Sequence, residues 1–339
     1  MNGKHLKPGI IAGSTHPAYA EAVARILDTR LIERDIKTFA NGEIDIKICE
    51  TVAGLDVFII QTSLTGQAND NLMETLLLAD ALFRARAKSV NLIQLSFPYA
   101  RKDRKEDDKA TQRPKRCPIS SKVVATMLEN VGIQFVVTLH LHAPQIVGFF
   151  DKTICENIVP FRVFAEYLEK ENLVDDTTVM AGPDIGAAKQ TDTASESMGL
   201  LLALIHKNRD GAKVSVDKLN VIGDVQGKNV VVYDDIIDTG GTAIASAAKF
   251  KQEGAKRLLL IATHGIFSKD AVEKLAQSEF EKIVITDSIP NKEIGKYPDK
   301  FIVLSTVPMV AGAISNLFND ESLDEVVRHN IKNKSQHVV

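Results

Sequence analysis

The residues best suited to chemistry stand in one stretch, where two adjacent carboxylates precede a turn of glycines and threonines. Glycine lets the backbone direct its N–H groups toward an anion, and threonine hydroxyls add further donors. Carboxylates repel phosphate, but they accept hydrogen bonds from the vicinal hydroxyls of a sugar or hold a metal ion bound to them. This combination predicts a ribose 5-phosphate pocket. Its residues are Asp234, Asp235, Asp238, Thr239, Gly240, Gly241 and Thr242.

The flanking residues place this turn between a strand and a helix. Residues 230–233 form a β-branched and aromatic run of the kind found in buried parallel strands. The alanine-rich residues 243–251 have helical composition, and the N-terminus of a helix attracts anions through its dipole and its N–H groups. A glycine pair between a strand and a helix is most often only a turn. The acidic pair is what favours a binding site over that simpler interpretation.

The order of the elements predicts the fold class and an internal duplication. Apolar strand-like runs alternate with helical segments, which is typical of parallel α/β architecture. Residues 54–93 also resemble residues 227–261: each copy has a glycine, a buried strand, a helix and a second strand. The first copy carries Gln61-Thr62-Ser63 where the second has the acidic pair and the glycine turn. We therefore expect two similar domains, of which only the second keeps the sugar-phosphate site.

Several other segments carry local structural signals. The Asn41-Gly42 turn and the alternating residues up to position 48 predict a β-hairpin with one exposed face. Residues 70–86 predict a helix that turns Leu72, Leu76, Leu77 and Ala79 inward. The charged residues 101–116 are either a solvated loop or an anion-binding segment, and residues 206–220 are polar and flexible in composition.

Composition excludes several classes of function. The chain has 339 residues, which suggests about two domains, and its formal charge of -3 gives no sign of a nucleic-acid surface. Three scattered cysteines predict reduced thiols, without a disulfide framework or a zinc site. The N-terminus has no apolar signal core, and the apolar runs are too short to span a bilayer. We expect a cytoplasmic protein that binds no membrane.

Motifs along almost the whole chain resemble those of the ribose-phosphate pyrophosphokinases, also called phosphoribosyl pyrophosphate synthetases. Each motif is weak alone, but their shared order is highly specific. The matching segments include Phe39-x-Asn41-x-Glu43, Asn69-Asp70-Asn71-Leu72-Met73-Glu74, Phe97-Pro98-Tyr99-Ala100-Arg101, Leu141-His142-Ala143, Pro183-Asp184, Leu204-Ile205-His206-Lys207-x-Arg209, the glycine turn, and Thr263-His264-Gly265-Ile266-Phe267-Ser268.

The resemblance implies an α/β fold of two tandem type I phosphoribosyltransferase-like domains, with parallel sheets flanked by helices. The domains would cover residues 1–155 and 156–308, and a helix and tail at 309–339 would pack back on the first domain. The implied enzyme is a ribose-phosphate diphosphokinase of nucleotide biosynthesis. It transfers the diphosphoryl group of ATP to the C1 hydroxyl of ribose 5-phosphate, which gives phosphoribosyl pyrophosphate and AMP.

The resemblance also assigns residues. Lys207, Arg209 and His142 match catalytic positions, and His142 and Asp184 match positions associated with Mg²⁺, which Mn²⁺ can replace. The expected ATP-binding residues are Phe39, Asn41, Glu43, Arg101 and Lys102. In the family the hairpin reaches into a neighbouring subunit, so a homo-oligomer is expected, usually a hexamer built from dimers. Phosphate and ADP are expected regulators.

Some positions depart from the family pattern. His140 stands where the family has Asp, which predicts weaker magnesium binding or a preference for a softer ion. Lys102 stands where the family has Gln, and the loop at 107–117 is longer than usual, so the family's regulation does not carry over directly. Two alternatives follow: a non-catalytic regulatory paralogue, and a phosphoribosyltransferase. The intact Lys207 and Arg209 argue against the first, and the duplicated domain argues against the second.

Overall fold

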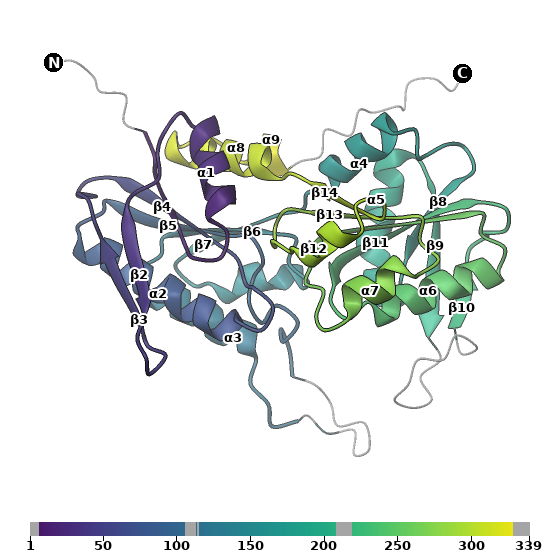
Figure 1. Ribbon diagram of the computed structural model, residues 1–339, viewed down its shortest axis with the longest axis horizontal. Coiled ribbons are helices and arrows are strands. Elements are labelled where there is room, and N and C mark those ends of the chain that lie inside the picture. Colours follow the sequence, from purple (N-terminus) through teal and green to yellow (C-terminus); the bar gives the residue numbers. More distant parts are fainter. Residues whose placement is uncertain (1–6, 106–112, 114, 208–218, 328–339) are drawn as a thin grey trace. The chain divides into compact units, whose positions relative to one another are not determined.

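The protein consists of two compact units, each built around a largely parallel sheet (Figure 1). The structure is a computed structural model that describes residues 7–105, 113, 115–207 and 219–327. The first unit runs to Val159 and also contains Ser288–Pro290 and Thr306–Val327. The second contains Pro160–Asp287 and Asn291–Ser305.

Five parallel strands form the sheet of the first unit, in the order β1-β4-β5-β6-β7. Helices cover both faces, so the central strands are mostly apolar, although β5 also buries Asn91 and Gln94. Helices α1 and α8 pack on one face and α2 and α3 on the other (Figure 1). The bounds are β1 (Gly9–Ala12), α1 (Pro17–Ile26), β4 (Asp56–Gln61), α2 (Ala68–Arg84), β5 (Ser89–Gln94), α3 (Ser120–Asn130), β6 (Phe135–Leu139), η1 (Pro144–Phe149), β7 (Ile154–Ile158), α8 (Val307–Phe318) and α9 (Asp324–Val327).

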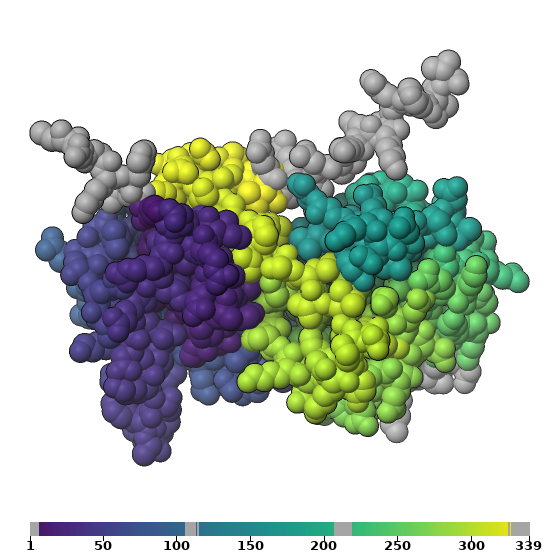
Figure 2. Space-filling view, turned by 45° about the horizontal axis from the view of Figure 1, so that its top comes forward, coloured from purple at the N-terminus to yellow at the C-terminus, as the bar shows by residue number. Residues whose placement is uncertain are grey.

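The hairpin of the first unit consists of β2 (Arg34–Thr38) and β3 (Ile44–Ile48). Its isoleucines 36, 46 and 48 pack against the core, while alternate side chains face solvent, which confirms the predicted hairpin with one exposed face. Both views show the tip of the hairpin projecting away from its sheet (Figures 1 and 2). Side chains at this tip are therefore presented for binding rather than for packing.

Helix α2 turns most of the predicted residues toward the core: Ala79 lies in it, and Leu72 and Leu76 pack against it. Of the predicted inward residues only Ala79 is fully buried; Leu72, Leu76 and Leu77 are partly buried. The buried positions are Asn71, Glu74, Thr75, Leu78, Ala79 and Leu82. Three of these are polar, and internal hydrogen bonds compensate for their burial: the Asn71 side chain, for example, accepts one from Leu64 N at 2.9 Å. A pattern that follows only apolar residues misses such a stripe.

Seven strands form the sheet of the second unit, in the order β10-β9-β8-β11-β12-β13-β14. Only the edge strand β10 is antiparallel to its neighbour, so the predicted parallel α/β architecture is confirmed. Helices α6 and α7 cover one face (Figure 1). The bounds are α4 (Phe161–Lys170), β8 (Thr178–Gly182), η2 (Ile185–Ala187), α5 (Ala188–Met198), β9 (Leu201–Lys207), β10 (Leu219–Ile222), β11 (Asn229–Ile237), α6 (Gly241–Gln252), β12 (Arg257–Gly265), α7 (Ala271–Ala276), β13 (Lys282–Thr286), η4 (Glu293–Lys296) and β14 (Phe301–Leu304).

The predicted flexible stretch at 206–220 begins and ends in strand. Strand β9 continues through Lys207, and its backbone pairs with Leu219 at the start of β10. The prediction was therefore wrong at both ends of the stretch, because a polar sequence gives no sign of a cross-strand partner. In the described chain, Cys49, Cys117 and Cys155 are free thiols, and no helix is long and apolar enough to cross a membrane.

Candidate ribose-phosphate and nucleotide sites

The carboxyl ends of β8 and β11 bring three carboxylates together in the second unit. These two strands pair in parallel as far as Ala181 and Val232, so Asp184, which follows β8, and Asp234 and Asp235, near the end of β11, come from the same edge of the sheet. Asp235 is only 6% exposed, and Asp234 and Asp184 are half-buried. The sequence predicted this edge from Asp234 and Asp235, and the structure adds Asp184 to it.

Burial is the main perturbation of the Asp234 carboxyl group. It raises the pKa of Asp234 well above its usual value, and the charges of Asp235 and Asp184 raise it further. The Asp235 N–H donates to Asp234 Oδ1 at 3.0 Å, which favours the ionised form but does not outweigh burial. Such a group of carboxylates is suited to a ligand that donates hydroxyl hydrogens or carries positive charge.

The glycine turn after β11 has a conformation that other residues adopt poorly. Gly240 has φ +74°, and a Cβ at this position would lie 3.0 Å from Leu275 Cγ. Glycine is therefore required both for the backbone angle and for the space. Helix α6 begins at Gly241, and within the described residues no side chain caps it. Its first N–H groups face the turn, where Thr239 and Gly241 are exposed, as an anion site requires.

The segment that follows β12 supports this turn through backbone hydrogen bonds. The N–H groups of Ile266 and Phe267 donate to Ile237 O at 2.9 and 3.2 Å, and Ser268 N donates to Asp238 O at 3.1 Å. Residues 263–268 were recognised from the sequence as a family motif, without an assigned role. Their backbone position identifies them as the support of the glycine turn.

One of the predicted catalytic cations, Lys207, lies at the end of the strand on the other side of β8. Lys207 is the last residue of β9, the strand next to β8 in the sheet. Arg209 lies outside the described residues. The structure therefore places the start of the predicted catalytic loop but not its second cation.

The first unit carries the predicted nucleotide residues on its hairpin and at the carboxyl edge of its sheet. Phe39 is 54% exposed at the hairpin tip, where its N–H donates to Glu43 O at 2.8 Å. Asn41 Oδ1 accepts a hydrogen bond from Glu43 N at 3.1 Å, which shapes the turn and leaves the amide group of Asn41 exposed. An exposed aromatic ring beside an amide and a carboxylate is a suitable surface for a nucleobase.

Three further predicted residues follow strands of this sheet. Arg101 and Lys102 are exposed after β5, and Lys102 O accepts hydrogen bonds from Ser121 N and Oγ at 3.2 and 2.9 Å. His142 is exposed after β6, whereas His140 is 4% exposed. The departure from the family pattern therefore falls on an inward position, and the predicted metal-associated histidine is the one that faces solvent.

No group of three or more His, Cys, Asp or Glu side chains converges to hold a metal in the described part of the chain. The predicted metal residues belong to different units, His142 to the first and Asp184 to the second. A Mg²⁺ ion that keeps most of its coordination sites for water and substrate phosphates needs only a few protein ligands. Asp184, with its oxygen donors beside other carboxylates, fits such an ion.

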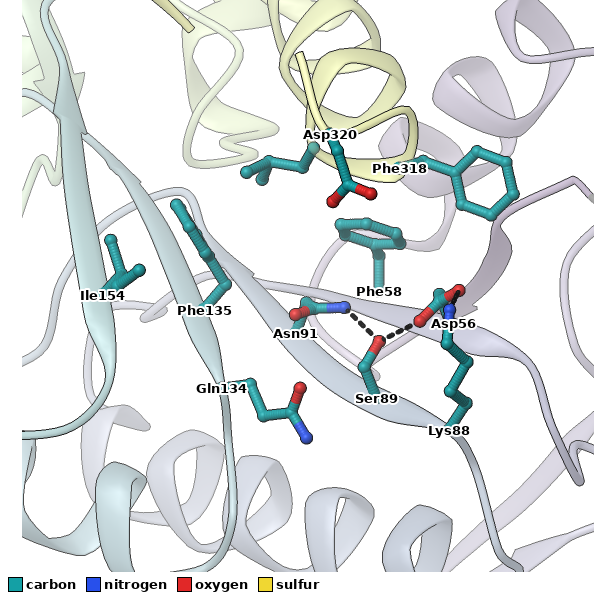
Figure 3. Close-up of a pocket in the computed structure, with 11 residues that line it drawn as sticks. Asp56, Phe58, Lys88, Ser89, Asn91, Gln134, Phe135, Ile154, Phe318 and Asp320 are labelled. Carbon is teal, nitrogen blue, oxygen red and sulfur yellow. Dashed lines mark hydrogen bonds and ion pairs between the residues drawn. The ribbon is translucent and has the colours of Figure 1, made fainter. Parts of the chain in front are cut away.

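A cavity of about 430 Å³ opens at the opposite, amino-terminal edge of the first sheet (Figure 3). Phe58, Phe135 and Phe318 line it, with a polar group in which Ser89 Oγ donates to Asp56 Oδ1 at 2.6 Å. Phe318 ends α8, and the other residues lie near the starts of β4, β5 and β6, whereas the candidate residues Arg101, Lys102 and His142 follow the ends of β5 and β6. The cavity is therefore separate from the candidate site.

Comparisons with known proteins agree over most of the chain. A family model described as the N-terminal domain of ribose phosphate pyrophosphokinase matches residues 9–132, and a phosphoribosyl synthetase-associated domain matches residues 212–328. The chain is 38% identical to a ribose-phosphate pyrophosphokinase of Wolinella succinogenes, covering 94% of this chain and 98% of that protein. For a ribose-phosphate pyrophosphokinase of Thermosipho africanus the values are 39%, 94% and 97%. A crystal structure of phosphoribosylpyrophosphate synthetase from Mycobacterium smegmatis superposes with a TM-score of 0.84 at 34% identity, covering 93% of this chain and 99% of that one.

The two glycines of the turn should respond differently to substitution. Gly240→Ala introduces an unfavourable φ and a contact with Leu275, so the free energy of unfolding should fall by about 1–3 kcal/mol. Gly241→Ala is the matched control, because its Cβ would meet only Thr239 Oγ1 at 3.9 Å. Urea denaturation of both variants measures the difference. Equal stability of the two would contradict the geometry assigned to the turn.

The pKa of Asp234 predicts a specific dependence of stability on pH. Because its pKa is raised in the folded state, the native protein binds more protons than the unfolded chain above about pH 4. The free energy of unfolding should therefore fall as pH rises through this window, and Asp234→Asn should become increasingly stable relative to the ligand-free parent protein. Urea denaturation at pH values from about 4 to about 8 measures this trend.

Asp224→Asn supplies the control of opposite sign. A hydrogen bond with Lys228 lowers the pKa of Asp224, so this carboxylate stabilises the fold above its unfolded pKa and loses that effect as pH falls. Asp224→Asn should become less stable than the parent as pH rises. If Asp234→Asn followed the same trend as Asp224→Asn, the account of the buried carboxyl group would be wrong.

Proposed function

The chain belongs to the ribose-phosphate pyrophosphokinase family, and we propose how its residues divide that reaction between the two units. The protein transfers the diphosphoryl group of ATP to ribose 5-phosphate and so makes phosphoribosyl pyrophosphate. We base this division on the edge of the second sheet, where buried carboxylates lie beside an exposed glycine turn. Within the described residues, the first unit has no equivalent turn in its copy of this motif.

The second unit binds ribose 5-phosphate in this proposal. Asp234 and Asp235 accept hydrogen bonds from the two vicinal hydroxyls of the ribose. The backbone N–H groups at 239–242, together with the hydroxyls of Thr239 and Thr242, hold the 5-phosphate. Support comes from the burial of the carboxylates and from the positive φ of Gly240. Asp238 supports the turn through its backbone carbonyl, which accepts a hydrogen bond from Ser268.

The first unit binds ATP in this proposal. The ring of Phe39 stacks on the adenine, and Asn41 and Glu43 make hydrogen bonds to its edge. Arg101 and Lys102 provide positive charge for the phosphates. Because the hairpin tip projects away from its own sheet, we infer that it serves a neighbouring subunit in a homo-oligomer built from dimers (Figure 2). Regulation by phosphate and ADP stays a prediction, since most of the long loop lies outside the described residues.

The chemical step is in-line attack of the C1 hydroxyl oxygen on the β-phosphorus of ATP. A P–O bond forms to the C1 oxygen, whose proton passes to water, and the bond from the β-phosphorus to the oxygen that bridges to the α-phosphate breaks, so AMP leaves with that oxygen. Lys207 and Arg209 stabilise the negative charge that spreads over the transferred phosphoryl oxygens, and His142 is the third residue with a catalytic role in this scheme. When bound, Mg²⁺, or Mn²⁺ in its place, neutralises phosphate charge, and Asp184 and His142 are the side chains that would hold it.

Neither alternative function is favoured. A phosphoribosyltransferase shares the sugar-phosphate turn, but the relatives cover 94% of the chain, which includes both units. A non-catalytic paralogue would have no reason to keep the buried carboxylates and the catalytic lysine together. Turnover of ATP and ribose 5-phosphate distinguishes the proposed enzyme from both alternatives.

Removal of Lys207 should affect catalysis rather than substrate binding. Lys207→Ala should lower kcat by about 100-fold or more and change the KM for ribose 5-phosphate by less than about threefold, because its contact is made in the transition state. The assay is ³¹P NMR with ATP, ribose 5-phosphate and Mg²⁺, in which the parent protein yields AMP and phosphoribosyl pyrophosphate in equal amounts. Lys170→Ala, on the exposed end of α4, is the control. An unchanged kcat for Lys207→Ala would remove this residue from the mechanism.

A further inference from the structure

In the first unit, side chains fill the region of the sheet edge that corresponds to the proposed sugar pocket of the second unit. Strands β1 and β4 are neighbours in the first sheet, as β8 and β11 are in the second. In the internal repeat, Gln61 stands where the second copy has Asp234. Gln61 is fully buried, and a Cβ on Gly13 would lie 2.5 Å from its side chain. The side chain of Gln61 therefore covers the backbone after β1, where the second unit presents Asp184.

A buried carboxylate from α2 organises this edge. Glu74 is 4% exposed and accepts three hydrogen bonds: from Ser14 N at 2.7 Å, from Ser14 Oγ at 2.5 Å and from Gln61 Nε2 at 2.9 Å. Gln61 Oε1 in turn accepts hydrogen bonds from the Thr15 hydroxyl and from Thr62 N. Every partner of Glu74 is a donor, so the site requires a group that only accepts.

The loop after β1 also holds the base of the hairpin. Arg34, the first residue of β2, donates from Nε to Ala12 O at 2.8 Å and from Nη2 to Gly13 O at 3.2 Å. The next residue along the loop, Ser14, is the one that Glu74 binds through both its N–H and its hydroxyl. Glu74 on α2 therefore holds the loop after β1, and this loop in turn holds Arg34 at the base of the hairpin.

We propose that Glu74 is a positioning residue for ATP, which acts through Ser14 and Arg34 on the hairpin that carries Phe39, Asn41 and Glu43. The inference rests on the proposed assignment of this hairpin to the nucleotide. It explains why a polar residue occupies the buried stripe of α2: the carboxylate sets the position of a loop on which a binding element stands. Misplacement of a binding group by a fraction of a bond length is enough to weaken its contacts.

Steady-state kinetics of Glu74→Gln tests the proposal. The new amide places a donor against the donors of Ser14 or Gln61, so the loop and the base of the hairpin shift. The KM for ATP should rise roughly tenfold, while the KM for ribose 5-phosphate and kcat should stay within about twofold. Arg34→Met removes only the hydrogen bonds between the hairpin and the loop, and it should give the same selective rise in the KM for ATP. This variant replaces Glu74→Gln as the test if Glu74→Gln does not fold.

Glu129→Gln is the matched control in the same unit. The Glu129 carboxylate also holds a loop by accepting backbone hydrogen bonds, from Asp151, Lys152 and Thr153 at 2.8, 2.6 and 3.1 Å. That loop leads into β7 and has no contact with Arg34 in the hydrogen bonds of the described residues. The control should lose a similar amount of thermal stability without a selective change in the KM for ATP.

Phe39→Ala separates failure of this inference from failure of the proposed function. If Phe39→Ala raises the KM for ATP and neither Glu74→Gln nor Arg34→Met does, the hairpin binds ATP and the positioning role of Glu74 is wrong. If Phe39→Ala leaves the KM for ATP unchanged, the nucleotide assignment of the hairpin fails, and the inference fails with it. Equal effects of Glu74→Gln and Glu129→Gln on both substrates would reduce Glu74 to a general stabilising role.

Discussion

The burial of like-charged carboxylates at the end of β11 is the interaction on which the active edge depends. Asp235 is almost fully buried beside Asp234, and the Asp184 charge adds to the repulsion. In an isolated protein such an arrangement is unfavourable, because burial and like charge both oppose ionisation. A sugar that donates two hydroxyl hydrogens, or a cation, relieves this cost. The neighbouring turn, required to be glycine at position 240 and held by residues 266–268, completes a site for a ligand with hydroxyls and a phosphate.

The two units show how one architecture supports two different edges. In the second unit, the carboxyl ends of β8 and β11 carry Asp184, Asp234 and Asp235 and an exposed turn. In the first unit, the ends of β1 and β4 are filled by Gln61, which Glu74 binds from α2. The filled edge cannot receive a sugar phosphate, and its buried hydrogen bonds instead fix a loop to which the hairpin is attached. In the proposed assignment, the duplication therefore yields a binding pocket in one unit and a rigid base for a binding hairpin in the other.

Local signals allowed the sequence to predict the central features. The apolar run, acidic pair and glycine turn at 230–242 are contiguous, and the structure forms them as strand, sheet edge and helix start. The inward position of Glu74 was not predictable, because its partner Ser14 comes from the loop after β1, its partner Gln61 comes from β4, and an acidic residue in a helix is normally exposed. Strand β10 was missed for a similar reason, since only pairing with β9 reveals it. Arg209 and most of the loop at 107–117 lie outside the described residues, so their predicted roles stay predictions.

The most direct test of the central claim is calorimetric titration of ribose 5-phosphate into the parent protein and into the double variant Asp234→Asn with Asp235→Asn. The account predicts that affinity falls by about tenfold or more, because each lost charge-assisted hydrogen bond to a hydroxyl contributes about 1.5–3 kcal/mol. The binding of ATP should stay unchanged and serves as the internal control for folding. Normal affinity of the variant for ribose 5-phosphate would contradict the assignment of the carboxylate pair to the sugar.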